Sequence, residues 1–453
     1  MLYEIAEDLK GEILKYSEDY DIFIENHSAI NIDSEKDNIN FAKEEYNFGI
    51  GVRILNNNKM GFAYSSNIED YKELAEKAFL NSKLNEMDEN FSFALKSKYS
   101  SVKGLCDKKY DELEVDDLSE ILKMSIDTVN DNGCEATSGG VSAYSLNSLV
   151  VNSNGVELEN SSTSFSTHIA VNAESGGEKS TYYDSESLRT FNLNPIKLAN
   201  DVCNLAKNSL GGIKTDTDDK TVVLDYHAAS GLLGTFIGAF NGGNVLRGRS
   251  ILADKLLQEI APNNLSIYDD GTIDGALVSS NGDNEGISSQ KTVLVENGIL
   301  NGFIYDVYNS NKYNNSKLNL NKNSNVYDDN DPLKQLSTGN GFRSFSSIPN
   351  ISTTNIVFDF KDLNDINEVK NGILAIDVLG AHTANPISGD FSVEINNPFL
   401  IENGEITKPI KKAMLSGNVF DLINQVKGLK SKIQQKGSFI IPQLVCENLR
   451  IVG

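Results

Sequence analysis

The sequence lacks any long apolar run. No segment reaches the about 18 apolar residues that a membrane-spanning helix needs. Residues 1–16 form a charged amphipathic pattern, which differs from the apolar centre of a signal peptide. We therefore expect a soluble, cytoplasmic protein with no membrane partner.

Cysteine is scarce, and its spacing excludes two further classes. The four cysteines are Cys106, Cys134, Cys203 and Cys446, and no two of them form a Cys-x-x-Cys pair. This spacing argues against a zinc knuckle and against a redox dithiol. We expect reduced, mostly buried thiols.

Basic residues are also in the minority. The chain has 40 lysines and arginines against 64 acidic residues, a net charge of −24. A nucleic-acid partner would need a basic stripe that displaces counterions. The most lysine-rich stretch, residues 427–436, is short and typical of a surface helix or loop. We expect no nucleic-acid binding.

What the chain does contain is the composition of a globular protein, with 39% hydrophobic residues over 453 positions. This length predicts more than one domain. Residues 210–225 change from glycine-rich to acidic and then to a strand, so we place a boundary near residue 217. The expected domains are 1–217, divisible into sub-regions 1–100 and 101–217, and 218–453.

Hydrophobic periodicity predicts an α+β fold. Apolar residues at helical spacing, together with capping signals, indicate helices near 2–16, 70–84, 115–131, 195–209 and 228–243. Short strands fill most of the remainder, and turn signals join them at 56–59, 154–155, 176–177, 297–298 and 403–404. We expect N-terminal helices packed on antiparallel sheet, followed by a β-rich C-terminal domain with one long helix.

Several passages, taken in order, resemble the TldD/PmbA family, whose older description is modulator of DNA gyrase. They include GIGVRILNNNKMGFAYSS (49–66), VVLDYHAASGLLGTF (222–236), GDNEGISSQKTVLVENGILNGFIYD (282–306) and SGDFSVE (388–394). The resemblance spans nearly the whole chain. It implies membership in a family that includes zinc metalloproteases, in which TldD-type members carry a HExxxH motif.

The resemblance places that motif on residues that cannot bind zinc. Gly234 and Ala239 stand at the two histidine positions and Thr235 stands at the glutamate position. Zinc hydrolysis needs imidazole or carboxylate ligands and a carboxylate that takes a proton from the bound water. No histidine in the chain is followed by glutamate, and residues 434–443 lack the cysteine of TldD-type members.

This pattern resembles the PmbA/TldE type, the metal-free subunit of a heteromeric protease. The resemblance implies no cofactor in this chain and zinc in a TldD-type metalloprotease partner. The chain would shape the compartment and hold small or unfolded peptides, for which exposed sheet edges are suited. Two alternatives stay open: a stand-alone peptide-binding homo-oligomer, such as a homodimer, and a hydrolase that uses His382 and Asp390.

Four groups of polar residues are candidates for a site, and each also has a structural interpretation. In the 380–390 loop, His382 could act as a base oriented by Asp390, with Asn385 beside it, but the glycines and Pro386 favour a structural turn. Arg343 could contact a peptide from an exposed loop, or form a surface ion pair. His227 could be a displaced ligand or a polar residue at a helix start. The remaining group could bind a hard cation or form solvated turns, and consists of Asp269, Asp270, Asp283 and Glu285.

Overall fold

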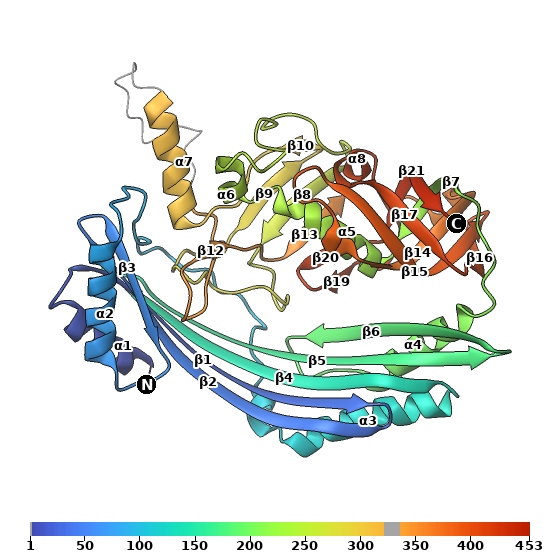
Figure 1. Cartoon of the computed structure of the whole chain (residues 1–453), viewed down its shortest axis with the longest axis horizontal. Coiled ribbons are helices and arrows are strands. Elements are labelled where there is room, and N and C mark those ends of the chain that lie inside the picture. Colours follow the sequence, from blue (N-terminus) through green and yellow to red (C-terminus); the bar gives the residue numbers. More distant parts are fainter. Residues whose placement is uncertain (1, 321–335) are drawn as a thin grey trace.

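The computed structural model describes residues 2–320 and 336–453, and it confirms the α+β fold. Figure 1 shows two layers: a long curved sheet built from the first half of the chain, and a second, β-rich body that lies over one face of that sheet.

The N-terminal sheet has six antiparallel strands in the order β3-β2-β1-β4-β5-β6. The strands are much longer than the short runs expected from the sequence, and β2 and β5 have 19 residues each. At about 3.4 Å per residue such a strand spans roughly 65 Å. The bounds are β1 Asp19–Glu35, β2 Asn38–Asn56, β3 Lys59–Ser65, β4 Glu135–Asn152, β5 Glu157–Ser175 and β6 Glu178–Leu188.

Four helices cover one face of this sheet. Alternate residues of the strands, such as Ile22, Ile24 and Val52, are fully buried against the apolar sides of the helices. The intervening residues, such as Asp21 and Arg53, point to the opposite face and toward the second body. The helices are α1 Leu2–Ile13, α2 Tyr71–Leu84, α3 Val115–Asp131 and α4 Pro195–Asn208, close to the four predicted ranges.

The turn signals mark real hairpins. Asn57 and Asn58 join β2 to β3 with positive φ angles, and Gly176 and Gly177 do the same between β5 and β6. Asn403 opens the turn between β15 and β16. These positions need left-handed backbone, which Asn and Gly adopt at little cost.

The second body contains a sheet that closes on itself. Its strands run β14-β7-β21-β17-β15, and β14 also pairs with β15. Two strands are attached at its margin, β16 to β15 and β18 to β21. The bounds are β7 Asp218–Leu224, β14 Asn371–Leu379, β15 Asp390–Glu402, β16 Glu405–Pro409, β17 Ala413–Asn418, β18 Lys427–Gly428 and β21 Leu444–Val452.

A second sheet of this body has the order β10-β9-β8-β13-β20-β19. Its bounds are β8 Leu265–Asp270, β9 Lys291–Glu296, β10 Ile299–Leu300, β13 Ile356–Phe360, β19 Gln434–Lys436 and β20 Phe439–Ile441. A separate pair consists of β11 Gly341–Phe342 and β12 Asn350–Ile351. The helical elements of this body are α5 Tyr226–Gly238, α6 Gly242–Leu246, α7 Val307–Leu320, α8 Val419–Asn424, η2 Ile366–Glu368 and η3 Ala381–Thr383, and a further short helix, η1 Lys108–Glu112, precedes α3 in the first half of the chain.

Helix α5 occupies the largest hydrophobic core. Leu232, Leu233 and Phe236 on its inner side are at most 1% exposed and pack with residues of both sheets. The sequence predicted this helix near 228–243, whereas it begins at Tyr226 and ends at Gly238. Among the described residues, no helix is both long and apolar enough to cross a membrane.

Candidate functional site

The positions matched to the zinc motif lie on α5. Gly234 is exposed, and a side chain there would meet no other atom within 4 Å. Thr235 is half-buried, and Ala239, just beyond the end of the helix, is 2% exposed and faces the core. The two positions of the expected histidines therefore face different environments.

These residues do not fit a zinc ion. Glycine, threonine and alanine side chains supply no imidazole, thiolate or carboxylate ligand. Across residues 2–320 and 336–453, no three His, Cys, Asp or Glu side chains are grouped so that they could hold a metal. Cys446, near the position of the cysteine of TldD-type members, is fully buried in β21.

At the N-terminal end of α5, His227 belongs to a polar cluster. Its Nε2 lies 2.7 Å from Oδ1 of Asp184 on β6, and Nζ of Lys436 on β19 donates to the same oxygen at 2.8 Å. Burial alone would raise the pKa of Asp184, but the hydrogen bonds and positive charges of these partners outweigh it and lower the pKa to about 2. His227 is thus a polar link between the two layers.

Two more carboxyl groups, both half-buried, lie near His227. Burial raises the pKa of Asp225, which accepts a hydrogen bond from Gln443 at 2.8 Å. Burial also raises the pKa of Asp377 on β14, whereas the nearby His227 acts to lower it. This grouping could not be predicted from the sequence, because its members come from β6, the start of α5, β14 and β19.

The 380–390 loop contains the expected turn. Gly380 and Gly389 have φ angles of 91° and 82°, in the left-handed region that favours glycine. The side-chain oxygen of Asn385 accepts from the backbone N–H groups of Ile387 and Ser388, at 2.9 and 3.1 Å. Asn385 therefore closes the loop through its own side chain.

The histidine and aspartate of this loop do not form a pair. His382 is exposed on η3, and within the described residues no hydrogen bond joins it to Asp390. Asp390 accepts hydrogen bonds from Ser388 and Asn418 instead, and these bonds lower its pKa. An acid–base pair would need the two side chains within hydrogen-bond reach of each other.

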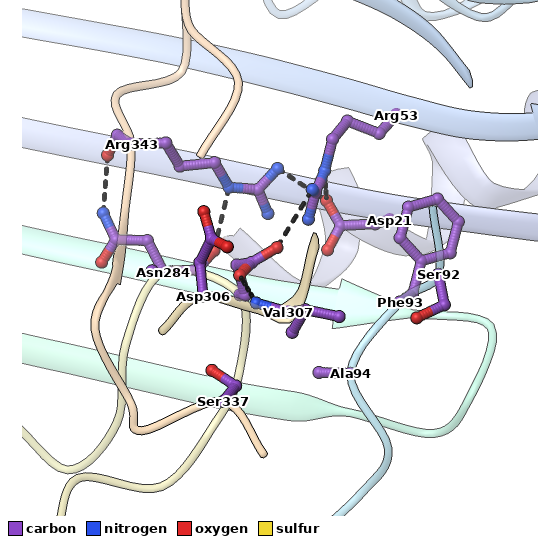
Figure 2. A network of polar contacts seen from close by, with 12 residues as sticks. Asp21, Arg53, Ser92, Phe93, Ala94, Asn284, Asp306, Val307, Ser337 and Arg343 are labelled. Carbon is purple, nitrogen blue, oxygen red and sulfur yellow. Dashed lines mark hydrogen bonds and ion pairs between the residues drawn. The ribbon is translucent and has the colours of Figure 1, made fainter. Parts of the chain in front are cut away.

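Arg343 is buried, so the expectation of an exposed loop or a surface ion pair is wrong. Its side chain is 1% exposed, its Nη1 lies 2.6 Å from Oδ1 of Asp21, and Nε donates to the Asn284 carbonyl at 2.9 Å (Figure 2). Arg53 donates to Asp21 and also to Glu285, at 3.1 and 3.2 Å. This cluster joins strands β1 and β2 to loops of the second body.

Three of the four acidic residues are likewise buried rather than solvated, whereas Asp270 is half-buried. Asp269, Asp283 and Glu285 are at most 7% exposed. Burial and the charge of Glu285 raise the pKa of Asp283 to about 7, although its carboxylate accepts three backbone N–H groups. Asp269 accepts from Asn340 and Thr354. Because these oxygens accept hydrogen bonds from other parts of the chain, the acidic residues hold loops of the second body together. Through Arg53 and Glu285 they also connect the second body to the N-terminal sheet.

The close glycines of β2 have a steric role that the sequence did not reveal. A side-chain carbon at Gly49 would lie 2.1 Å from the Phe345 ring, and one at Gly51 would lie 2.4 Å from the Phe345 carbonyl oxygen. The segment that carries Arg343 therefore crosses directly over β2. The two glycines therefore allow the two layers to pack closely at this point.

Comparison with known proteins identifies the family of this chain. Three family models match in order: PmbA/TldA metallopeptidase domain 1 over residues 20–82, the central domain over 108–210 and the C-terminal domain over 217–453. The chain belongs to the PmbA/TldD metallopeptidase family, as the sequence resemblance indicated.

Individual relatives and solved structures are also similar to this chain. The protein MJ0231 of Methanocaldococcus jannaschii is 34% identical over 94% of both chains, and metalloprotease MJ0996 of the same organism is 24% identical over 83% of this chain and 82% of its own. The crystal structure of TldE from Thermococcus kodakarensis has a TM-score of 0.88 at 24% identity, covering 99% of this chain and all of that one. A putative modulator of DNA gyrase from Thermotoga maritima has the same TM-score at 19% identity over the full length of both chains. These two structures share the fold.

Proposed function

We propose that this chain is a metal-free, TldE-type subunit that works with a TldD-type metalloprotease chain. In that complex the partner holds zinc and cleaves small or unfolded peptides, while this chain shapes the compartment and holds the substrate. The proposal combines the family of the chain with the residues that replace the zinc motif.

The composition of α5 and of the residue that follows it carries the proposal. Gly234, Thr235 and Ala239 supply no zinc ligand, and the described residues contain no alternative group of ligands. Yet the helix is retained, with its inner side in the largest core. A scaffold that keeps the helix but lacks the ligands is suited to a subunit whose chemistry is supplied by another chain.

The test begins with metal content. This chain, a TldD-type chain and their mixture are each dialysed against zinc, freed of loosely bound ions and subjected to elemental analysis. We expect near-zero zinc on this chain, zinc on the TldD-type chain, and co-elution of the two in size-exclusion chromatography. A tightly held zinc on this chain alone would overturn the proposal.

Cleavage of an unstructured peptide then separates the alternatives. We expect the mixture to cleave and this chain alone to be inactive, with chelators abolishing the activity of the mixture. Turnover by this chain alone that survives chelators and vanishes in His382→Ala would instead support the independent hydrolase. Peptide binding by a homo-oligomer that neither associates with the TldD-type chain nor changes its activity would support the stand-alone binding protein.

A further inference from the structure

A cavity of about 230 Å³ lies between the two layers, away from α5. Its floor comes from the face of β4 and β5 that is opposite the helices, and its walls come from the loops 277–284, 339–342 and 352–354 of the second body. The volume is below the about 300 Å³ at which pockets for drug-sized ligands begin. The cavity therefore suits a group of about one amino-acid side chain and its flanking amides.

Arg189 is the one basic side chain of the wall, and four of its five N–H donors are already engaged. Its guanidinium donates to four backbone carbonyl oxygens, those of Thr163, Ala276, Leu277 and Ser279. An anionic ligand would compete with these bonds, which tie the segment after β6 to β5 and to the 276–279 loop. Arg189 is thus a structural element of the cavity.

The one acidic side chain, Asp283, is engaged in the same way. Its oxygens accept the backbone N–H groups of Glu285, Ile287 and Gly341, at 2.8 to 3.0 Å. A cationic ligand would compete with three donors that the loop needs. Because the polar atoms of both charged groups form hydrogen bonds within the chain, a charged ligand would have to compete with these bonds.

Apart from these two charged side chains, the cavity is lined by uncharged polar and apolar groups. Among the described residues, the hydroxyls of Ser162 and Thr353 have no hydrogen-bond partner, so both can donate and accept. Leu105 and Leu146 contribute apolar wall. Val278 and Phe342 also line the cavity and stay 36% and 62% exposed, so their apolar surface is available for contact.

We propose that this cavity binds an uncharged apolar side chain of a peptide, with Ser162 and Thr353 available for its flanking amide groups. The inference deepens the proposed function, because it rests on the idea that this chain meets peptide substrates. It adds a binding site for one peptide side chain on this chain, apart from α5. It also adds a preference of that site for neutral apolar residues over charged ones.

The probes are four capped amino acids: N-acetyl-leucinamide, N-acetyl-phenylalaninamide, N-acetyl-aspartamide with a free side-chain carboxylate, and N-acetyl-lysinamide. Each is titrated into the full chain and followed by ligand-observed NMR. A ligand this small binds with a dissociation constant on the order of 1 mM. We expect saturable binding of the two apolar probes and dissociation constants at least about tenfold weaker for the two charged ones, because desolvating their charge is not repaid.

Val278→Asp tests the location, with Val452→Asp on β21 as its matched control. The two valines are 36% and 41% exposed, so both variants keep the added carboxylate near solvent. We expect Val278→Asp to weaken binding of N-acetyl-phenylalaninamide by at least about tenfold and Val452→Asp to leave it unchanged. Circular dichroism checks that both variants fold.

Three outcomes would overturn the inference: no saturable binding of either apolar probe up to about 20 mM, well above the expected constant; equal binding of charged and apolar probes; or equal effects of the two substitutions. These measurements use this chain alone. Their failure would therefore leave the zinc and cleavage tests of the proposed function unaffected, and a failure of those tests would leave the binding result standing.

Discussion

Arg343 and Asp21 form a buried ion pair between the two layers, with Nη1 and Oδ1 2.6 Å apart and both side chains at most 1% exposed. Burial acts to raise the pKa of Asp21, but Arg343 and Arg53 outweigh it and lower that pKa. The Arg343 guanidinium also lies over the Phe23 ring, 4.8 Å from its centroid. This pair fixes the 343–345 segment onto β1 and β2.

Removing the Arg343 guanidinium should therefore lower the stability of the folded chain. We expect Arg343→Leu to lower the free energy of unfolding by about 3–5 kcal/mol, because a buried carboxylate loses a partner. The matched control is Arg450→Leu, which breaks an ion pair to Asp219 with side chains 52% and 56% exposed. It should cost less than about 1 kcal/mol. Denaturant titration measures both, and equal losses would contradict the structural role of Arg343.

Two glycine-to-alanine substitutions should have opposite effects. Gly51→Ala places a carbon 2.4 Å from the Phe345 carbonyl oxygen, so the crossing segment must shift, at a cost of about 1–3 kcal/mol. Gly234→Ala places a carbon in open space on α5 and should stabilise the helix by about 0.5–1 kcal/mol. Thermal unfolding midpoints that move in the same direction for both variants would contradict this steric account.

The elements that the sequence predicted well depend on local signals. Helix α3 has the predicted bounds, because its apolar spacing, its acidic first turn and its capping box all lie within a few residues of one another. The signals for the Asn and Gly turns also lie within a few neighbouring residues. Helix α7 was missed because its sequence, rich in asparagine, has no apolar periodicity.

The strand lengths and the buried charges depend on distant contacts instead. Polar residues such as Asp21 and Arg53 interrupt the apolar pattern of β1 and β2, so the sequence indicated short runs. Their partners lie far along the chain, with Arg53 and Glu285 separated by 232 positions. The burial of Arg343, and the cluster of Asp184 with His227, could not be predicted because residue type and spacing do not specify which loops meet.

The structural and the catalytic interpretation of the 380–390 loop can be separated by measuring stability. If it is a structural turn, Asn385→Ala should cost about 1 kcal/mol of unfolding free energy, since two backbone N–H groups lose their acceptor. His382→Ala should change stability by less than about 0.5 kcal/mol, because the side chain is exposed. The variants are compared by denaturant titration. A larger loss in His382→Ala than in Asn385→Ala would contradict the turn.

Asp184 should make stability depend on pH in the acid range. Its pKa of about 2 lies below the ordinary value of 3.8, so the folded state favours the charged form. The stabilisation is present above about pH 4 and is lost as the pH falls toward 2. A shift of this size corresponds to about 2 kcal/mol, and the side chain is only 23% exposed, so screening by solvent is limited.

Asp184→Asn should therefore cost about 2 kcal/mol near pH 7, and its difference from the unsubstituted chain should shrink toward zero as the pH approaches 2. Asp219→Asn, at the exposed pair with Arg450, is the control and should differ by less than about 1 kcal/mol at any pH. Unfolding free energies are measured at intervals from about pH 7 downward. A difference for Asp184→Asn that stays constant through the acid range would mean that the link from β6 to His227 and Lys436 does not depend on the aspartate charge.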